Sequence, residues 1–369
     1  MRVVRVRLKE RSYPILIGSG LLLELGKHLK SSVFSGKHLV IVTQKNVWFH
    51  HGKTVLETLA REGFESSLFL TPVTKSSEAS KTQAVWSRLV RFLASKDGKN
   101  RPLAVLALGG GVIGDLAGFA SAIYRRGIPY AQIPTTLTAQ VDSSIGGKTG
   151  VDLPQGKNLL GTIYQPSLVL CDIATLNSLP ERNWSDGFAE VIKYGVIRDP
   201  RLFAQLEREG LDGVRAHAKL LESIIHRCVK IKADIVAQDE LDKTGVRIVL
   251  NFGHTVGHAI ESVSQYSRAY THGEAVGIGM LVASDIAREM GILRDLSLIE
   301  RIEGTLIKFR LPVYTKNVSG EAILKAIGYD KKSLQKKNRF VLPIKIGKTA
   351  IVTDVPTSVI AMAVEKRKG

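Results

Sequence analysis

The sequence predicts an α/β domain followed by a mostly α-helical domain. The chain has 369 residues, which is too long for one ordinary core and favours about two domains. In the first half, short apolar runs alternate with helical patterns, as in a layered α/β domain with a parallel sheet. Beyond about residue 185 the apolar residues recur mainly at helical spacing. We therefore place the two domains at residues 1–185 and 186–369.

The elements of the first half follow from hydrophobic periodicity. The N-terminal stretch MRVVRVRLKERSYPILIGSG (1–20) alternates apolar and charged residues, as a strand does. The runs HLVIVT (38–43) and LAVLALG (103–109) are short and apolar throughout, which is typical of buried strands in a parallel sheet. Helices are predicted at 54–63 and 83–94, between strands.

The second half opens with SDGFAEVIKYGVI (185–197), in which Ser185 or Asp186 is a plausible helix N-cap. Long helical patterns follow along most of the remaining chain. The runs FVLPIKIG (340–347) and KTAIVT (348–353) are exceptions and predict a small hairpin within this domain.

Composition excludes several classes of protein. The formal net charge is +18, but Lys and Arg are spread along the chain without a recognisable nucleic-acid module, so we expect no nucleic-acid partner. A site for phosphorylated small molecules and a basic solvated surface both remain open. We expect no membrane span, because no apolar run has the necessary length. Only Cys171 and Cys228 occur, which argues against a disulfide framework and fits a reducing cytoplasm.

A glycine-rich turn follows the predicted strand at 103–109. Gly109, Gly111 and Gly114 match G-x-G-x-x-G before a probable helix start, where free backbone N–H groups can bind a pyrophosphate. The acidic ribose partner about 20 residues later is missing, since no acid lies between Asp115 and Asp142. A tight structural turn is the alternative.

The segment IPTTLTAQVDSSIGGKTGVDLPQGKNLLG (133–161) is dense in small, hydroxyl and lysine residues. Small residues allow a ligand to approach the backbone, hydroxyls donate hydrogen bonds, and lysines neutralise phosphate. We therefore favour a binding role over a plain loop.

Three histidines and one glutamate are candidate metal ligands: Glu190, His254, His258 and His272. A catalytic zinc site takes three such ligands and leaves one position open. The i, i+4 spacing of His254 and His258 makes them the first guess, but the Glu of H-E-x-x-H is absent. A structural role remains open for each one, and His50 and His51 are expected in a surface loop.

Six blocks of sequence together resemble the 3-dehydroquinate synthase family. They are GGGVIGD, IPTTLTAQVDSSIGGKTGVD, GKNLLGTIYQP, GFAEVIKYG, LNFGHTVGHAIE and HGEAVGIGM, in the family's order between about 105 and 280. The resemblance implies an N-terminal Rossmann-like domain, a C-terminal helical domain and an active site in the cleft. It also implies a cytoplasmic homodimer.

The activity that this resemblance implies is that of an NAD- and zinc- (or cobalt-) dependent lyase. The substrate is a phosphorylated sugar acid, 3-deoxy-D-arabino-heptulosonate 7-phosphate, and the products are 3-dehydroquinate and phosphate. Oxidation is transient, because hydride passes to NAD and returns within one turnover. Phosphate elimination, ring opening and an intramolecular aldol step complete the reaction of the shikimate pathway.

The resemblance also assigns the site residues. It gives the metal to Glu190, His254 and His272, and places His258 near the substrate phosphate instead. The substrate-binding and catalytic set that it implies is Lys193, His258, Asn251, Arg126, Lys148, Asn158, Lys232, Arg247, Asp142 and Lys331. The NAD-binding set is Asn46, Glu78, Lys81, Gly110, Gly111, Val112, Ile113, Gly114, Asp115, Thr135, Thr136, Asp142, Lys148, Lys157, Thr175, Leu176, Asn177 and Ser178.

Three other functions remain as alternatives. A sister sugar phosphate cyclase, making an inosose or a valiolone, shares most of these motifs. A metal-dependent NAD polyol dehydrogenase of related fold needs fewer phosphate-directed cations. A binding module without catalysis has no need of a metal site beside a cofactor loop.

Overall fold

The structure is a computed structural model that describes residues 1–73, 78–98, 101–264, 269–332 and 338–369, with only the backbone for 329–332. Two compact units form. The N-terminal unit comprises Met1–Pro180 and Ile225–Leu241, and the C-terminal unit comprises Glu181–Ile224 and Asp242–Gly369. Helix α7 (Ala218–Gln238) therefore contributes residues to both units.

The N-terminal unit is built on a mixed sheet. Within the described residues, seven strands pair in the order β1-β2-β9-β6-β5-β3-β4. Only β1 runs antiparallel to its neighbour, and the other pairs are parallel, which confirms the predicted parallel α/β domain. The strands are β1 (Arg2–Val6), β2 (Tyr13–Gly18), β3 (His38–Thr43), β4 (Ser66–Leu70), β5 (Leu103–Gly109), β6 (Tyr130–Pro134) and β9 (Leu168–Asp172).

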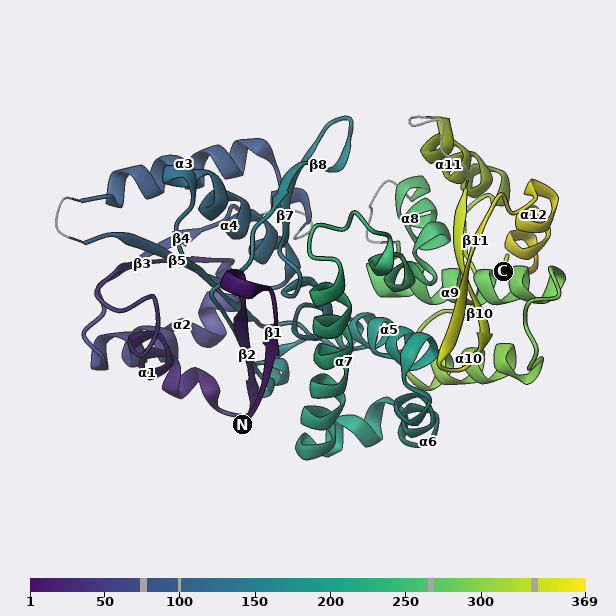
Figure 1. Cartoon of the computed structure of the whole chain (residues 1–369), viewed down its shortest axis with the longest axis horizontal. Helices are drawn as coiled ribbons and strands as arrows, with labels where there is room; N and C mark the ends of the chain where they lie inside the picture. Colours follow the sequence, from purple (N-terminus) through teal and green to yellow (C-terminus); the bar gives the residue numbers. More distant parts are fainter. Residues whose placement is uncertain (74–77, 99–100, 265–268, 333–337) are drawn as a thin grey trace. The chain divides into compact units, whose positions relative to one another are not determined.

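Helices cover both faces of this sheet (Figure 1). Leu39 and Ile41 of β3 pack with α1 (Leu25–Lys30) and α2 (Lys45–Arg61) on one face. Val40 and Val42, which alternate with them, pack on the other face with α3 (Gln83–Lys96) and α4 (Gly111–Ile123). Because side chains alternate along a strand, an apolar run such as HLVIVT can fill both layers.

Two predicted details of this half are wrong. Helix α2 begins at Lys45 rather than 54, and it includes His50 and His51, which we expected in a loop. The Nε2 atom of His51 lies 3.0 Å from the Ser178 hydroxyl, so this histidine packs inward.

The polar run 133–161 forms a π-helical turn (Ala139–Ser143) and a hairpin of β7 (Lys148–Leu153) and β8 (Gly156–Ile163).

The C-terminal unit is mostly helical, as predicted. Its further elements are α5 (Glu181–Arg198), α6 (Pro200–Ala216), α8 (His254–Val263), α9 (His272–Glu289), α10 (Ser297–Lys308), α11 (Gly320–Lys332), β10 (Arg339–Lys345), β11 (Lys348–Thr353) and α12 (Thr357–Lys366). Strands β10 and β11 form the predicted hairpin. None of the helices in the described part of the chain has the length and apolar character needed to cross a membrane.

The expected N-cap of α5 is wrong. The helix begins at Glu181, directly after Pro180, so Ser185 and Asp186 lie inside it. Ser185 is buried, and the Asp186 carboxylate instead accepts a hydrogen bond from Gly273 N at 2.6 Å. The sequence pattern indicated that the Asp186 carboxylate caps its own helix, but in the structure it binds a backbone N–H that is distant in sequence.

Helix α9 is the centre of this unit, since it packs against α5, α8, α10, α12 and β10 (Figure 1). Two glycines allow the closest contacts. A Cβ atom on Gly279 would lie 2.0 Å from the carbonyl oxygen of Gly253, and one on Gly273 would lie 2.1 Å from that of Asp186. Only glycine permits such an approach between backbones.

The Gly279→Ala substitution is therefore expected to lower the free energy of unfolding by about 3 kcal/mol, the upper end of the cost of overpacking. Urea unfolding followed by circular dichroism measures the change. The matched control is Gly304→Ala in α10, where a Cβ atom meets nothing within 4 Å. That substitution should raise stability by about 0.5 kcal/mol. Equal effects of the two changes would contradict the close-contact argument.

Candidate functional site

Glu190, His254 and His272 come together inside the C-terminal unit. Glu190 is on α5, His254 is the first residue of α8, and His272 is the first residue of α9. One potential ligand atom from each lies within 4.8 Å of those from the other two. The Nε2 atoms of both histidines are 3.3 Å from Glu190 Oε1.

The other nitrogen of each imidazole has an acceptor. Nδ1 of His254 lies 3.1 Å from the Phe252 carbonyl, and Nδ1 of His272 lies 3.3 Å from Glu261 Oε2. A carbonyl and a carboxylate can only accept, so we assign a proton to each Nδ1. In the neutral tautomer each Nε2 then presents a lone pair toward the Glu190 carboxylate. Such a convergence requires a shared proton or a cation.

The electrostatics favour positive charge at this point. Burial lowers the pKa of His272, but hydrogen bonds to Glu190 and Glu261 raise it well above its ordinary value, so this ring holds a proton that a bound metal would displace. Burial alone would raise the pKa of Glu190, but the Lys193 ammonium and His254 hold that pKa well below its ordinary value. Burial and Lys193 lower the pKa of His254, which keeps its imidazole neutral, as a metal ligand must be. Two histidines and one carboxylate are a common ligand set of catalytic zinc, so these residues fit a divalent metal.

Two further predicted residues, Lys193 and His258, lie beside this cluster and differ in burial. Lys193 is almost fully buried, at 1 % exposure, and its ammonium contacts Glu190. His258 is exposed, and its ring centroid lies 5.3 Å from that of His254. Arg247 is buried in a 3-10 helix (Val246–Asn251), at whose end Asn251 is exposed.

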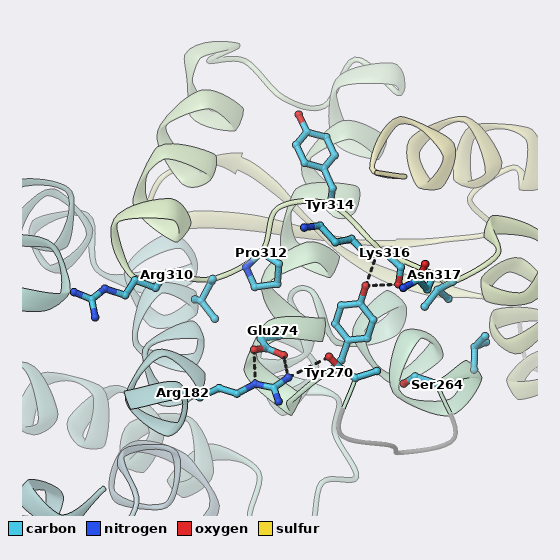
Figure 2. Close-up of a pocket in the computed structure, with 13 residues that line it drawn as sticks. Arg182, Ser264, Tyr270, Glu274, Arg310, Pro312, Tyr314, Lys316 and Asn317 are labelled. Atoms are coloured by element: carbon cyan, nitrogen blue, oxygen red, sulfur yellow. Dashed lines mark hydrogen bonds and ion pairs between the residues drawn. The ribbon is translucent and has the colours of Figure 1, made fainter. Parts of the chain in front are cut away.

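A pocket of about 650 Å³ borders the start of α9 (Figure 2). Arg182 spans one side and donates to both oxygens of Glu274, at 2.8 and 2.7 Å. Glu274 also forms a reciprocal capping box with Thr271, which fixes the turn that carries His272. The described residues that line the pocket include none of the predicted site residues. The pocket is therefore distinct from the cluster of predicted metal ligands, although both lie near the start of α9.

In the N-terminal unit the glycine turn opens helix α4. Gly110 is its N-cap and offers no side-chain cap to the first-turn N–H groups. A Cβ atom on Gly111 would lie 2.8 Å from the Ser143 hydroxyl, and one on Gly110 would lie 3.1 Å from Thr136. The turn is thus a close-packed backbone cradle of the kind that binds a pyrophosphate.

A polar network around the buried Lys81 flanks this cradle. The Lys81 ammonium lies 2.6 Å from both Asp115 Oδ2 and Asn158 Oδ1. The hairpin β7–β8 is tied to the same place, because Asp152 N donates to the Lys81 carbonyl at 2.8 Å. Burial raises the pKa of Asp115 to about 6, although the Lys81 ammonium opposes that rise.

Other predicted residues of this unit form separate groups. Lys157 pairs with Glu78 at 3.4 Å. Lys232 of α7 donates to the Asp142 carbonyl and pairs with its carboxylate, both at 2.7 Å. Buried Thr175 accepts from Gln140 at 3.3 Å and opens the segment that ends at Ser178.

A few predicted site residues are not brought together by contacts. Within the described residues, Asn46 and Arg126 are exposed and neither forms a hydrogen bond or ion pair with another predicted site residue. Lys148 is also exposed. The side chain of Lys331 lies outside the described residues.

The structure adds residues that the sequence reasoning did not select. Glu261 accepts from a predicted ligand, Asp152 holds the hairpin, and Asp186 holds the start of α9. Glu261 lies one helical turn after His258, so the i, i+3 spacing could have drawn attention to it. Nothing in the local pattern distinguishes Asp152, and the pattern at Asp186 indicates a helix cap rather than a contact with α9.

Comparison with known proteins adds an independent finding. A model of the 3-dehydroquinate synthase N-terminal region matches residues 71–186, and one of the C-terminal region matches residues 187–333. A protein of Thermodesulfovibrio yellowstonii named 3-dehydroquinate synthase is 45% identical over 352 residues, covering 95% of this chain and 96% of its own. One of Aliivibrio fischeri with the same name is 42% identical over 371 residues, covering 100% of both.

Solved structures of similar fold include enzymes of other names. The 2-epi-5-epi-valiolone synthase of Streptomyces hygroscopicus, solved with NAD+ and Zn2+ bound, has a TM-score of 0.85 at 28% identity and covers 99% of each chain. Glycerol dehydrogenase of Schizosaccharomyces pombe shares the fold alone, with a TM-score of 0.63 at 16% identity, 95% of this chain and 88% of its own. The family models and the full-length relatives agree, and the chain belongs to the 3-dehydroquinate synthase family.

Proposed function

We propose that this chain is a 3-dehydroquinate synthase, a phosphorus–oxygen lyase. It converts 3-deoxy-D-arabino-heptulosonate 7-phosphate into 3-dehydroquinate and phosphate. The observation that carries the proposal is the convergence of Glu190, His254 and His272 in a chain that belongs to this family over nearly its whole length.

The cofactors of the proposal are NAD and Zn²⁺ or Co²⁺. When bound, NAD supplies a reversible oxidation and the metal supplies Lewis acidity toward the substrate. We assign the metal to Glu190, His254 and His272, because their donor atoms fit it. We assign NAD to the N-terminal unit, where the turn at Gly110 and the network around Lys81 support the binding of a dinucleotide.

Lys193 and His258 have different proposed roles beside the metal ligands. The buried Lys193 ammonium compensates the charge of Glu190, so the carboxylate stays ionised in a desolvated place. His258 is exposed on the same helix as His254 and is free of the metal in our assignment. We assign His258 to the substrate phosphate, because an exposed imidazole can donate to it or move a proton there.

The remaining polar set suits a substrate with a phosphate and a carboxylate. Cationic and amide side chains supply the donors that both groups need: Arg126, Lys148, Asn158, Lys232, Arg247 and Asn251. Asp142 orients Lys232 within this set, because two of its oxygens bind the ammonium. The role of Lys331 stays a prediction, as do the homodimer and the cytoplasmic location.

Phosphate release tests the proposal. Purified protein with NAD and Zn²⁺ should release phosphate from 3-deoxy-D-arabino-heptulosonate 7-phosphate without steady accumulation of NADH. The substitution His272→Ala should reduce the rate about a thousandfold, because the Lewis acid contributes several kcal/mol. A phosphate assay and the ultraviolet absorbance of NADH measure both quantities.

The control for this experiment is His217→Ala, at an exposed histidine of the same unit, and it should leave the rate unchanged. Release of phosphate from glucose 6-phosphate instead, or cyclisation of sedoheptulose 7-phosphate, would reassign the chain to a sister cyclase. Steady NADH production from an unphosphorylated polyol would overturn the cyclase function altogether.

The Asp115 carboxyl should titrate near pH 6 in the folded protein. Its pKa lies above the value of about 3.9 in an unfolded chain. The folded state thus binds more protons between these values, and this group's contribution to stability falls as pH rises from about 4 to about 6. Carbon-13 NMR of labelled aspartate carboxyls, assigned with Asp115→Asn, measures the midpoint.

Removal of the neighbouring cation by Lys81→Met should raise the Asp115 midpoint further, because the ammonium favours the ionised carboxylate. The matched control is Lys96→Met, whose ammonium lies over the Phe92 ring and away from this network. An Asp115 midpoint near pH 4 in the wild type and in both lysine variants would contradict the argument that burial raises the pKa of Asp115.

A further inference from the structure

We infer that Glu261 is a positioning residue for the metal site: its carboxylate accepts the Nδ1–H of His272 and thereby turns the Nε2 lone pair of that ring toward the metal. This inference rests on the proposed assignment of the metal to Glu190, His254 and His272. It assigns a role to a residue that was absent from the predicted site.

Glu261 has the placement that such a role requires. It lies on α8, two turns after His254, and its Oε2 is 3.3 Å from His272 Nδ1. Its side chain is only 11% exposed, so the carboxylate does not turn freely into water. The opposite nitrogen of the same ring is 3.3 Å from Glu190 Oε1. The imidazole is therefore held between two carboxylates.

An imidazole that gives one lone pair to a metal keeps one N–H, so as a ligand His272 can serve only one of these carboxylates as a donor. Glu261 is the better acceptor for the proton, because the Glu190 side also receives Nε2 of His254. With the proton on Nδ1, both histidines direct Nε2 to the same point. With the proton on Nε2, the three-ligand set loses one member.

His258, Glu261 and His272 form a second group with metal-ligand spacing, within 4.8 Å of one another. The two groups share His272, and its neutral ring cannot give a lone pair to each of them. Glu261 is consequently an acceptor for the ring and not a ligand. A carboxylate behind a metal-bound histidine fixes its orientation and makes the metal-binding nitrogen more basic.

The two histidines differ in the strength of this support. His254 donates to a neutral carbonyl of Phe252, whereas His272 donates to a charged carboxylate. Charge-assisted hydrogen bonds are about twice as strong as neutral ones. His272 is the more exposed of the two ligands, at 33% against 12%, so it gains more from a fixed orientation.

The test measures metal binding rather than turnover. The metal-free protein and its Glu261→Ala and Glu261→Gln variants are titrated with Zn²⁺ against a competing chelator, and with Co²⁺ followed by visible absorption. Glu261→Ala should raise the dissociation constant about 10- to 100-fold, with one ion still bound per chain. Glu261→Gln should lose less, because its amide oxygen can still accept from Nδ1. The cobalt absorption of both should differ from that of the wild type.

Asp285→Asn is the matched control, because Asp285 is a buried carboxylate of the C-terminal unit that pairs with Lys366 and Arg367. It should lower the thermal midpoint of the metal-free protein but leave metal affinity within about twofold of the wild type. An unchanged affinity and cobalt spectrum in Glu261→Ala would overturn the positioning role. Two ions per wild-type chain, one lost in Glu261→Ala, would instead make Glu261 a ligand. A wild type that binds no ion would overturn the proposed metal site itself.

Discussion

The contact of α9 with the backbones of its neighbours is the constraint on which the metal cluster depends. Gly279 lies against the carbonyl of Gly253, the residue directly before His254, and Gly273 lies against the carbonyl of Asp186, one turn before Glu190. The two contacts therefore fix three chain segments at backbone distance. Each of the three predicted ligands is within one helical turn of such a contact. The absence of a side chain at Gly273 and Gly279 therefore determines how closely the three ligands are spaced.

Electrostatic balance is the second requirement of this arrangement. A fully buried carboxylate such as Glu190 is costly unless positive charge compensates it. Lys193 supplies one charge from the same helix, three residues on. The two imidazoles face the other oxygen, each with its Nε2 at 3.3 Å, where a proton or a metal ion can be shared. The N-terminal unit uses a different device, in which Lys81 is held by Asp115 and Asn158 beside a cradle of backbone N–H groups.

Buried strands, which depend on local sequence patterns, were predicted correctly, whereas features that depend on contacts between distant residues were not. Apolar runs such as 38–43 and 103–109 identified buried parallel strands, because their pattern depends on burial alone. The start of α5 was misplaced, because Asp186 looks like a cap in sequence but binds Gly273, 87 residues away. Residue spacing left His254 and His258 equal as ligands, and the family resemblance chose between them. Glu261 was missed because only the fold brings it to His272.

The difference between His254 and His258 has a local physical cause. Both lie on one face of α8, but His254 is its first residue, and the Phe252 carbonyl before it lies outside the helix and accepts its Nδ1–H. At His258, one turn later, the carbonyl two residues before the histidine lies inside the helix and belongs to the helix ladder. Its ring is also exposed, which suits a group that exchanges protons with a bound phosphate better than one that holds an ion. The start of the helix thus provides an imidazole that is oriented by a backbone carbonyl, and the position one turn later provides an exposed one.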